Sequence, residues 1–232
     1  MIPRLDAALI AARDADTIAA LAQAAQGTGF ATVHNTALTE PRVREVIETY
    51  RAFFHLPETQ KRDVDMARTG SNRGWGAAGS EQVDPDANPD YKQFFDAGFT
   101  LPADDPLAAL SVYAPNRWPA QPARFQQVIA AYYSDACAVA MTVLRGIAEA
   151  IDAPRDYFDA AFDKPMALLR GNYYPQRPAW ATAQDFGIAT HTDYGCLTLL
   201  ATARPGLRCA SAAVAGVRFR RNRARSSSTL AR

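Results

Sequence analysis

The residues of this chain whose types and spacing could do the most specific chemistry are His191, Thr192 and Asp193. In an extended segment successive side chains alternate faces, so His191 and Asp193 point the same way and can converge on one metal ion. An imidazole and a carboxylate are two of the three ligands of the facial Fe(II) site, which leaves positions open for oxygen and a co-substrate. The other histidines are His34 and His55, and none follows Asp193. The motif therefore predicts an iron site with two ligands from this segment.

A second segment, about twenty residues before this motif, is rich in side chains that form hydrogen bonds. These side chains are Arg170, Asn172, Tyr173 and Tyr174. A guanidinium, an amide and two phenols could orient a dicarboxylate through neutral and charge-assisted hydrogen bonds. If the segment is a strand, its side chains alternate between two faces, so one of the two tyrosines is expected to pack in the core.

The elements that would position these residues are helices first and strands later. Apolar spacing of period 3.6 predicts helices at 15–26, 40 to about 56, about 121–151 and 156–162. Short apolar or alternating runs predict strands at 30–34, 94–99, 166–174, 188–191 and 196–201. Residues 58–90 and 102–119 show no sustained periodicity and are expected to form loops. This order favours a helical layer backing a β-sandwich or barrel over a βαβ repeat.

The composition is that of an ordinary globular chain, with 48% hydrophobic and 21% charged residues among 232. No uninterrupted apolar run approaches the roughly 20 residues of a membrane span. The N-terminus lacks the charged-then-apolar pattern of a signal peptide. Cys137, Cys196 and Cys209 are odd in number and widely spaced, which indicates neither a disulfide framework nor a zinc site. We therefore expect a cytoplasmic protein without a membrane partner.

The net charge of +1 conceals an asymmetry along the chain. From Arg204 to the end there are eight arginines, no lysine and no acid, which leaves 17 basic residues (25 minus 8) against 24 acids before it. Clustered arginines could serve as an arm that binds nucleic acid or a membrane surface. The alternative, which we favour, is a tail not selected as part of this fold, for example from a shifted reading frame. Nucleic acid is then not the expected partner.

Several ordered motifs extend the signal beyond the His-x-Asp triplet. They are Gly29-Phe30, the run from Arg51 to Pro57 with Lys61, Arg73-Gly74-Trp75, the segment from Leu169 to Pro175, and His191 to Gly195. On these motifs, residues 29–207 resemble the isopenicillin N synthase-like branch of the Fe(II)- and 2-oxoglutarate-dependent oxygenases. The similarity extends more loosely to bacterial members that form ethylene or succinate.

The resemblance implies a mainly β fold with α-helices, namely a double-stranded β-helix (jelly roll) with N-terminal and backing helices. The oxygenase domain would cover residues 1–207, with an N-terminal helical part at about 1–120. The jelly-roll core would start at about 166–207. Residues 208–232 would be an arginine-rich tail outside the fold.

The resemblance also implies a site and an activity. The metal ligands would be His191 and Asp193, the contacts to 2-oxoglutarate Asn172, Tyr174 and Arg170, and the weaker candidates for the substrate pocket Arg73 and Trp75. Packing is the alternative for Arg73 and Trp75, and a structural role is an equal alternative for Arg170. The implied enzyme is a non-haem iron dioxygenase. It couples the decarboxylation of 2-oxoglutarate by molecular oxygen to the oxidation of a small molecule.

The chain departs from this pattern after Leu207. The family needs a second histidine on a later strand and then an Arg-x-Ser pair that holds the distal carboxylate of 2-oxoglutarate. No histidine follows Asp193, and Arg225-Ser226-Ser227 lies too near it. We therefore expect a C-terminally truncated or frame-shifted oxygenase with an incomplete jelly roll and impaired activity. The alternatives are an iron oxidase that does not use 2-oxoglutarate and a non-catalytic binding module with a basic tail.

Overall fold

The computed structural model describes residues 2–82, 88–176, 179, 182, 185 and 195–202, and the backbone of 208–211, 214–218 and 228–231. The chain forms two compact units whose sequence ranges interleave. Unit 1 comprises Met1–Arg44, Ser134–Ala160 and Asp193–Arg232, and unit 2 comprises Glu45–Tyr133 and Ala161–Thr192. Two long helices, α3 (Glu40–Phe54) and α6 (Phe125–Ala150), each contribute one end to each unit.

Two helices, α1 (Ala7–Ala11) and α2 (Ala15–Gln26), follow the first strand of unit 1. The predicted helix at 15–26 is confirmed with its N-cap. The Asp14 carboxylate accepts hydrogen bonds from the backbone N–H and the hydroxyl of Thr17 at 2.9 and 2.7 Å. These bonds hold the pKa of Asp14 below its ordinary value, and they satisfy a donor that would be orphaned at the helix start. Gly27 follows the last turn.

The sheet of unit 1 has the strand order β1-β2-β9-β6. Its strands are β1 (Arg4–Asp6), β2 (Ala31–His34), β9 (Ser228–Ala231) and β6 (Thr198–Leu200). β1 and β2 are parallel, and β9 is antiparallel to both of its neighbours. Buried aliphatic side chains from β1, β2, the two short helices and α6 form its core, among them Leu5, Ile10, Leu21, Val33 and Val143. The strands predicted at 30–34 and 196–201 are confirmed here.

The C-terminal segment contributes backbone pairing that the sequence did not predict. β7 (Arg208–Ser211) and β8 (Val214–Arg218) form a two-stranded antiparallel ribbon. β9 lies hydrogen-bonded between β2 and β6. The expectation that residues 208–232 form a tail outside the fold stays a prediction. The domain boundary at residue 207 stays a prediction.

Unit 2 contains short elements where the sequence predicted a loop. They are α4 (Glu58–Lys61), a 3-10 turn at Arg62–Val64, α5 (Met66–Thr69) and β3 (Gly74–Gly76). Each has only three or four residues, which is too short to show a period in the sequence. Further 3-10 turns lie at Pro106–Ala109, Ser111–Tyr113 and Ala160–Phe162. The last replaces the helix predicted at 156–162.

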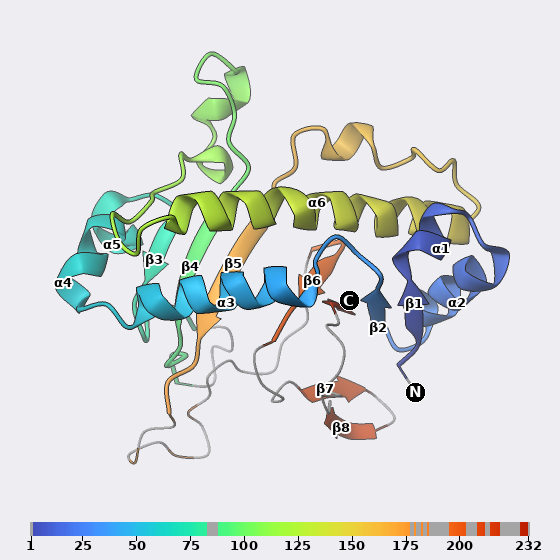
Figure 1. Cartoon of the computed structure of the whole chain (residues 1–232), viewed down its shortest axis with the longest axis horizontal. Coiled ribbons are helices and arrows are strands. Elements are labelled where there is room, and N and C mark those ends of the chain that lie inside the picture. Colours follow the sequence, from blue (N-terminus) through green and yellow to red (C-terminus); the bar gives the residue numbers. More distant parts are fainter. Residues whose placement is uncertain are drawn as a thin grey trace. The chain divides into compact units, whose positions relative to one another are not determined.

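The sheet of unit 2 is antiparallel, with β3, β4 (Gln93–Gly98) and β5 (Leu168–Tyr173) side by side (Figure 1). The strands predicted at 94–99 and 166–174 are therefore confirmed. The register places Phe95 opposite both Trp75 and Gly171, and Asp96 opposite Arg170. Because directly opposite residues share a face, Phe95 and Gly171 lie on one face of the sheet and Asp96 and Arg170 on the other. We call the face with Asp96 and Arg170 the charged face.

The face that carries Phe95 packs on aromatic side chains from α3 and α6. The Phe95 ring centroid lies 5.1 Å from that of Phe53 and 4.9 Å from that of Phe125, both near edge-on. Gly171 sits under the Tyr50 ring, where a Cβ atom would lie 2.6 Å from ring carbons. A glycine is required at this position because the ring occupies the space of any side chain. We call this side of the sheet the aromatic face.

Helix α6 is the one helix among the described residues whose length and composition would allow it to cross a membrane. The core helix of a folded domain passes the same test. In α6, buried side chains include those of Phe125, Ile129, Val143 and Leu144. The helix predicted at about 121–151 is confirmed, and the absence of a membrane partner stays a prediction.

Candidate functional site

Strand β5 separates the two tyrosines that the sequence could not tell apart. Tyr173 lies on the aromatic face, stacked on Phe54 with the ring centroids 5.5 Å apart. Tyr174 follows on the opposite side with 47% of its surface exposed, and Asn172 is also exposed. Neither Asn172 nor Tyr174 hydrogen-bonds to another side chain within the described part of the chain. The expectation that one of the two tyrosines packs inward is confirmed for Tyr173, which is half-buried against Phe54.

Arg170, the third predicted contact to 2-oxoglutarate, is held by two carboxylates on the charged face of the sheet. Its Nε and Nη2 atoms donate to the two oxygens of Asp96 at 2.8 and 2.7 Å, and Nη1 donates to Glu81 at 2.7 Å. The guanidinium also lies 4.2 Å from the centroid of the Phe94 ring. Three of its five N–H groups are thus engaged, and two remain for a ligand. This favours a structural role while leaving a direct contact possible only through those two.

Asp96 and Arg170 shift each other's pKa in opposite directions. Burial raises the pKa of Asp96, and the hydrogen bonds from Arg170 oppose that rise. Burial would lower the pKa of Arg170, but its bonds to Asp96 and Glu81 raise it above the ordinary value. We take Asp96 as ionised at neutral pH because a two-pronged guanidinium contact stabilises the carboxylate form.

A second cluster of charges lies beside the first and was not predicted from the sequence. Lys92 and Asp90 are both 1% exposed, and their Nζ and Oδ2 atoms are 2.6 Å apart. The Lys92 ammonium also lies 2.9 Å from Oε2 of Glu81. The hydrogen bonds of Glu81 to Lys92 and Arg170 outweigh the effect of burial and lower the pKa of its carboxyl. The only hint in the sequence is the alternation of Asp90, Lys92 and Asp96 along one extended segment.

The acids of this cluster act on Tyr174. Partial burial and the charge of Asp90 raise the pKa of the Tyr174 phenol to about 12, with Glu81 adding to the effect. The phenol is therefore protonated at neutral pH and can donate a hydrogen bond. Asn172, two residues earlier on the same face, offers both an amide donor and a carbonyl acceptor. Such a pair suits a carboxylate or keto oxygen.

Arg73 and Trp75 are buried, at 2% and 3% exposure, so their placement favours packing. Nη2 of Arg73 donates to the backbone carbonyl of Val112, and its guanidinium covers Gly98, where a Cβ atom would meet it at 2.5 Å. The indole N–H of Trp75 donates to the side-chain oxygen of Gln93 at 3.0 Å. A role for either residue in substrate binding stays a prediction.

The predicted metal ligands His191 and Asp193 lie outside the described residues, as does the strand predicted at 188–191. Among the residues that the structure describes, no group of three His, Cys, Asp or Glu side chains could hold a metal ion. His55 is exposed and packs edge-on against Tyr173, while His34 lies 3.6 Å from Asp6 in unit 1. Neither histidine stands in a described cluster of ligands.

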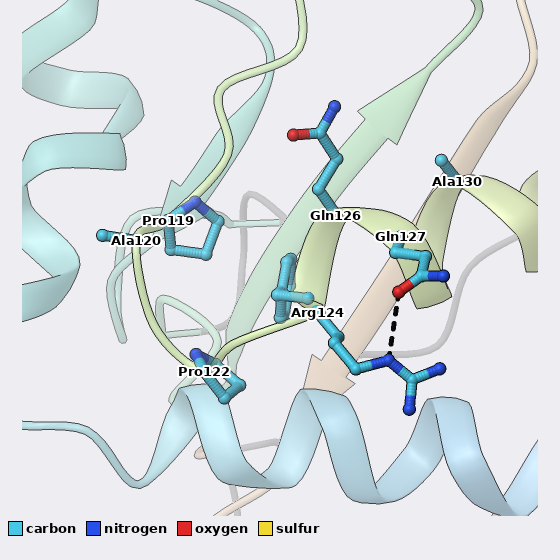
Figure 2. A pocket seen from close by; sticks show the side chains of 8 residues that line it. Pro119, Ala120, Pro122, Arg124, Gln126, Gln127 and Ala130 are labelled. Carbon is cyan, nitrogen blue, oxygen red and sulfur yellow. Dashed lines mark hydrogen bonds between the residues drawn. The ribbon is translucent and has the colours of Figure 1, made fainter.

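An open hollow in unit 2 lies apart from all of these residues. It is lined by side chains around the start of α6, from Pro119 to Ala130 (Figure 2). Arg124 is among them, with Nε donating to the side-chain oxygen of Gln127 at 3.0 Å (Figure 2). Its Nη2 atom also lies 3.7 Å from Glu45 on α3. None of the site residues predicted from the sequence lines this hollow.

Comparison with protein families gives a match over residues 2–121, just over half of the chain. The matching model describes the N-terminal domain of non-haem dioxygenases in morphine synthesis. It covers β1 to β4 of the structure, and so includes both predicted motifs at Gly29-Phe30 and Arg73-Gly74-Trp75.

Curated relatives point the same way. A 2-oxoglutarate-Fe(II) type oxidoreductase of Aspergillus fumigatus is 28% identical over 207 residues, which cover 85% of this chain and 61% of that protein. The 2-oxoglutarate-dependent dioxygenase frbJ of a Dothideomycetidae species is 32% identical over 169 residues, 70% of this chain and 44% of that protein. This chain therefore spans about half the length of such relatives.

Solved structures share the fold. A 2OG-Fe(II) oxygenase family protein from Caulobacter crescentus superposes with a TM-score of 0.83 at 25% identity, covering 99% of this chain and 73% of that one. A full-length Neurospora crassa protein in complex with alpha-KG superposes with a TM-score of 0.78 at 25% identity, with coverage of 99% and 72%. The predicted jelly-roll fold with added helices is confirmed. The assignment to the isopenicillin N synthase-like branch and the truncation stay predictions. The family itself is shown: this chain belongs to the Fe(II)- and 2-oxoglutarate-dependent oxygenases.

Proposed function

We propose that this chain carries the site of an Fe(II)- and 2-oxoglutarate-dependent oxidoreductase that acts on a small molecule. His191 and Asp193 would hold the metal, and Asn172 and Tyr174 would contact 2-oxoglutarate. The observation that carries the proposal is the charged face at β5. It presents an amide and a protonated phenol, both exposed, in a chain whose family uses a dicarboxylate co-substrate.

The donor set of β5 fits 2-oxoglutarate. When bound, iron and 2-oxoglutarate supply the reaction with oxygen that yields succinate, carbon dioxide and an oxidised substrate. The chain's own residues bind and orient. Tyr174 would donate its O–H to a co-substrate oxygen, and Asn172 would bind the co-substrate through its amide. Arg170 holds the strand through Asp96 and Glu81 and adds positive charge to the same face.

The partners in this proposal are a small molecule and molecular oxygen. The Neurospora crassa protein has also been solved with thymine and with 5-formyluracil, so a related protein binds ligands of that size. We also propose a cytoplasmic location, because the three cysteines are widely spaced and odd in number, which does not indicate a disulfide framework.

Binding under anaerobic conditions tests the proposal. Calorimetry with Mn(II), followed by 2-oxoglutarate, should show weak metal binding because two motif ligands hold a metal less tightly than three. The variant His191→Ala should abolish it, and the matched control His55→Ala should leave it unchanged because His55 is an exposed histidine. Metal binding that survives His191→Ala would overturn the ligand assignment.

A turnover assay separates the alternatives. With Fe(II), oxygen and 2-oxoglutarate, the proposed function requires some succinate to form, at a low rate if activity is impaired. Metal binding without any succinate would favour an iron oxidase that does not use 2-oxoglutarate. Absence of metal binding would favour a non-catalytic binding module.

A further inference from the structure

The segment from residue 77 to residue 92, which we call the excursion, is described at 77–82 and 88–92, and backbone hydrogen bonds join these two parts at its base. The N–H of Gly79 donates to the carbonyl of Asp90 at 2.9 Å, and the N–H of Asp90 donates to the carbonyl of Glu81 at 2.8 Å. These bonds fix Glu81 and Asp90 next to each other. The excursion thus presents two carboxylates from a defined position in unit 2.

Glu81 uses its two oxygens for two different partners. Oε2 lies 2.9 Å from Nζ of Lys92, whose position is fixed by the buried contact to Asp90. Oε1 accepts from Nη1 of Arg170 at 2.7 Å. The carboxylate therefore joins the base of the excursion to β5. Since Lys92 is buried and anchored, Glu81 has little freedom to swing away from Arg170.

The link to Arg170 reaches the candidate co-substrate residues along the strand. Arg170 and Asn172 alternate with residues of the aromatic face and so project from the same side of β5. Tyr174, directly after the strand, lies close enough to Asp90, Arg170 and Glu81 for their charges to act on its phenol. We propose that Glu81 is a positioning residue that holds this side of β5 in place through Arg170, and so sets the placement of Asn172 and Tyr174 toward 2-oxoglutarate. The identity of the ligand rests on the proposed function, whereas the positioning rests on the contacts alone.

A second contact of the excursion supports the same role. Asn88 donates its amide to Oδ1 of Asp185 at 2.8 Å, and Asp185 is 6% exposed. Oδ2 of Asp185 accepts from the backbone N–H and the hydroxyl of Thr182, both at 2.7 Å. Asp185 stands six residues before His191 in the sequence. The excursion is therefore bound to the chain at β5 and again between β5 and the predicted metal motif.

Glu81 also acts on Tyr174 by its charge. The negative charges of Asp90 and Glu81 both contribute to the raised pKa of the phenol. Replacing Glu81 by a neutral residue removes one of them, so the phenol should ionise at a lower pH. A residue that only packs the excursion would not change this titration.

The test compares the wild-type chain with Glu81→Gln, with Glu81→Asp as the conservative variant and Glu58→Gln as the control. Glu58 also pairs with an arginine, Arg62, but both side chains are more than half exposed. Three readouts apply: the Kd for 2-oxoglutarate with Mn(II) under anaerobic conditions, the hydrogen exchange of amides 170–174, and the phenol titration with Tyr174→Phe as reference.

For Glu81→Gln we expect about a tenfold weaker Kd, from the loss of a charge-assisted hydrogen bond that orders the site. We also expect faster exchange at residues 170–174 and a lower phenol pKa. Glu81→Asp keeps the charge and should keep the raised phenol pKa, with an intermediate Kd. Glu58→Gln should match wild type in all three. If Glu81→Gln does not fold, the same three measurements on Glu81→Asp decide whether Glu81 holds β5 in place.

Equal exchange and equal phenol titration in Glu81→Gln and Glu58→Gln would overturn the positioning role. If the wild-type chain does not bind 2-oxoglutarate, the proposed function fails instead. The exchange and titration readouts then still decide whether Glu81 holds β5. The two failures are therefore distinguishable.

Discussion

The two faces of the β3-β4-β5 sheet are stabilised in different ways. On the aromatic face, Phe95 contacts several rings, and these ring contacts do not depend on charge. On the charged face, Asp96 and Arg170 satisfy each other through two parallel hydrogen bonds. Ring packing is the sum of many individually weak contacts, whereas a buried charge depends on one particular partner. One face thus supports the fold, and the other combines support with exposed groups that can bind a ligand.

The largest loss of stability is expected from a substitution on the aromatic face. Phe95 is completely buried, so Phe95→Ala should lower the free energy of unfolding by about 3–5 kcal/mol through lost burial and a residual cavity. Urea denaturation followed by tryptophan fluorescence measures this change. The control Leu110→Ala removes a side chain that is 50% exposed and should cost far less. A loss below about 1 kcal/mol for Phe95→Ala would contradict the assigned core.

The next largest effect is expected on the charged face. Asp96→Asn keeps the shape of the side chain but leaves Arg170 without its main partner. Breaking a fully buried pair costs roughly 3–5 kcal/mol, and because a third of the Arg170 side chain is exposed we expect about 2–3 kcal/mol. The same denaturation measures it, with the exposed Asp104→Asn as control. Equal stability of the two variants would show that the pair does not hold this face.

The pH dependence sharpens the comparison because the charged face holds carboxylates, whereas the ring contacts of the aromatic face do not titrate. The folded chain lowers the pKa of Glu81 below its ordinary value of 4.5. Its contribution to stability is therefore complete above about pH 4.5 and is lost as the pH falls through the lower folded pKa. Denaturation midpoints from pH 7 to 3 should fall less steeply in Glu81→Gln than in wild type. Parallel pH profiles would exclude this contribution.

The smallest effect on stability is expected for two exposed residues, Asn172 near the end of β5 and Tyr174 directly after the strand. Asn172→Ala and Tyr174→Phe should change the free energy of unfolding by no more than about 0.5 kcal/mol, as surface substitutions do. Both should nevertheless weaken 2-oxoglutarate binding, by about tenfold for a lost hydrogen bond to a charged group. If these two variants lost much stability but bound 2-oxoglutarate as wild type does, Asn172 and Tyr174 would support the fold and not the ligand.

The sequence predicted the long elements and the alternation of β5 because these depend on local periodicity. α2, α3, α6 and β5 each have enough residues to show their period. The short elements between Glu58 and Gly76 do not, and tertiary contacts determine them. Their ends depend on side chains far along the chain. Lys61, for example, donates to the backbone carbonyl of Phe54 and to Gln93, 32 residues away.

The candidate site was predicted in part. The face shared by Asn172 and Tyr174 follows from the two-residue period of a strand, and the structure agrees. The carboxylates that hold Arg170 could not be predicted, because Glu81 and Asp96 lie 89 and 74 residues away from it in the sequence. Pairing over such distances depends on the sheet register and on the backbone hydrogen bonds that join residues 79 and 81 to Asp90. The metal motif remains a prediction from the sequence and the family.

Most of the lysines of this chain are buried, which is uncommon for this residue type. It has only three lysines, and two of them, Lys61 and Lys92, are 5% and 1% exposed. Lys164 is the one with a substantially exposed side chain, at 40%. An amine-directed acylating reagent should therefore modify Lys164 in the folded chain and reach the other two only when unit 2 opens. The acylation of Lys92 would thus report on local opening around the charged face, without any substitution in the chain.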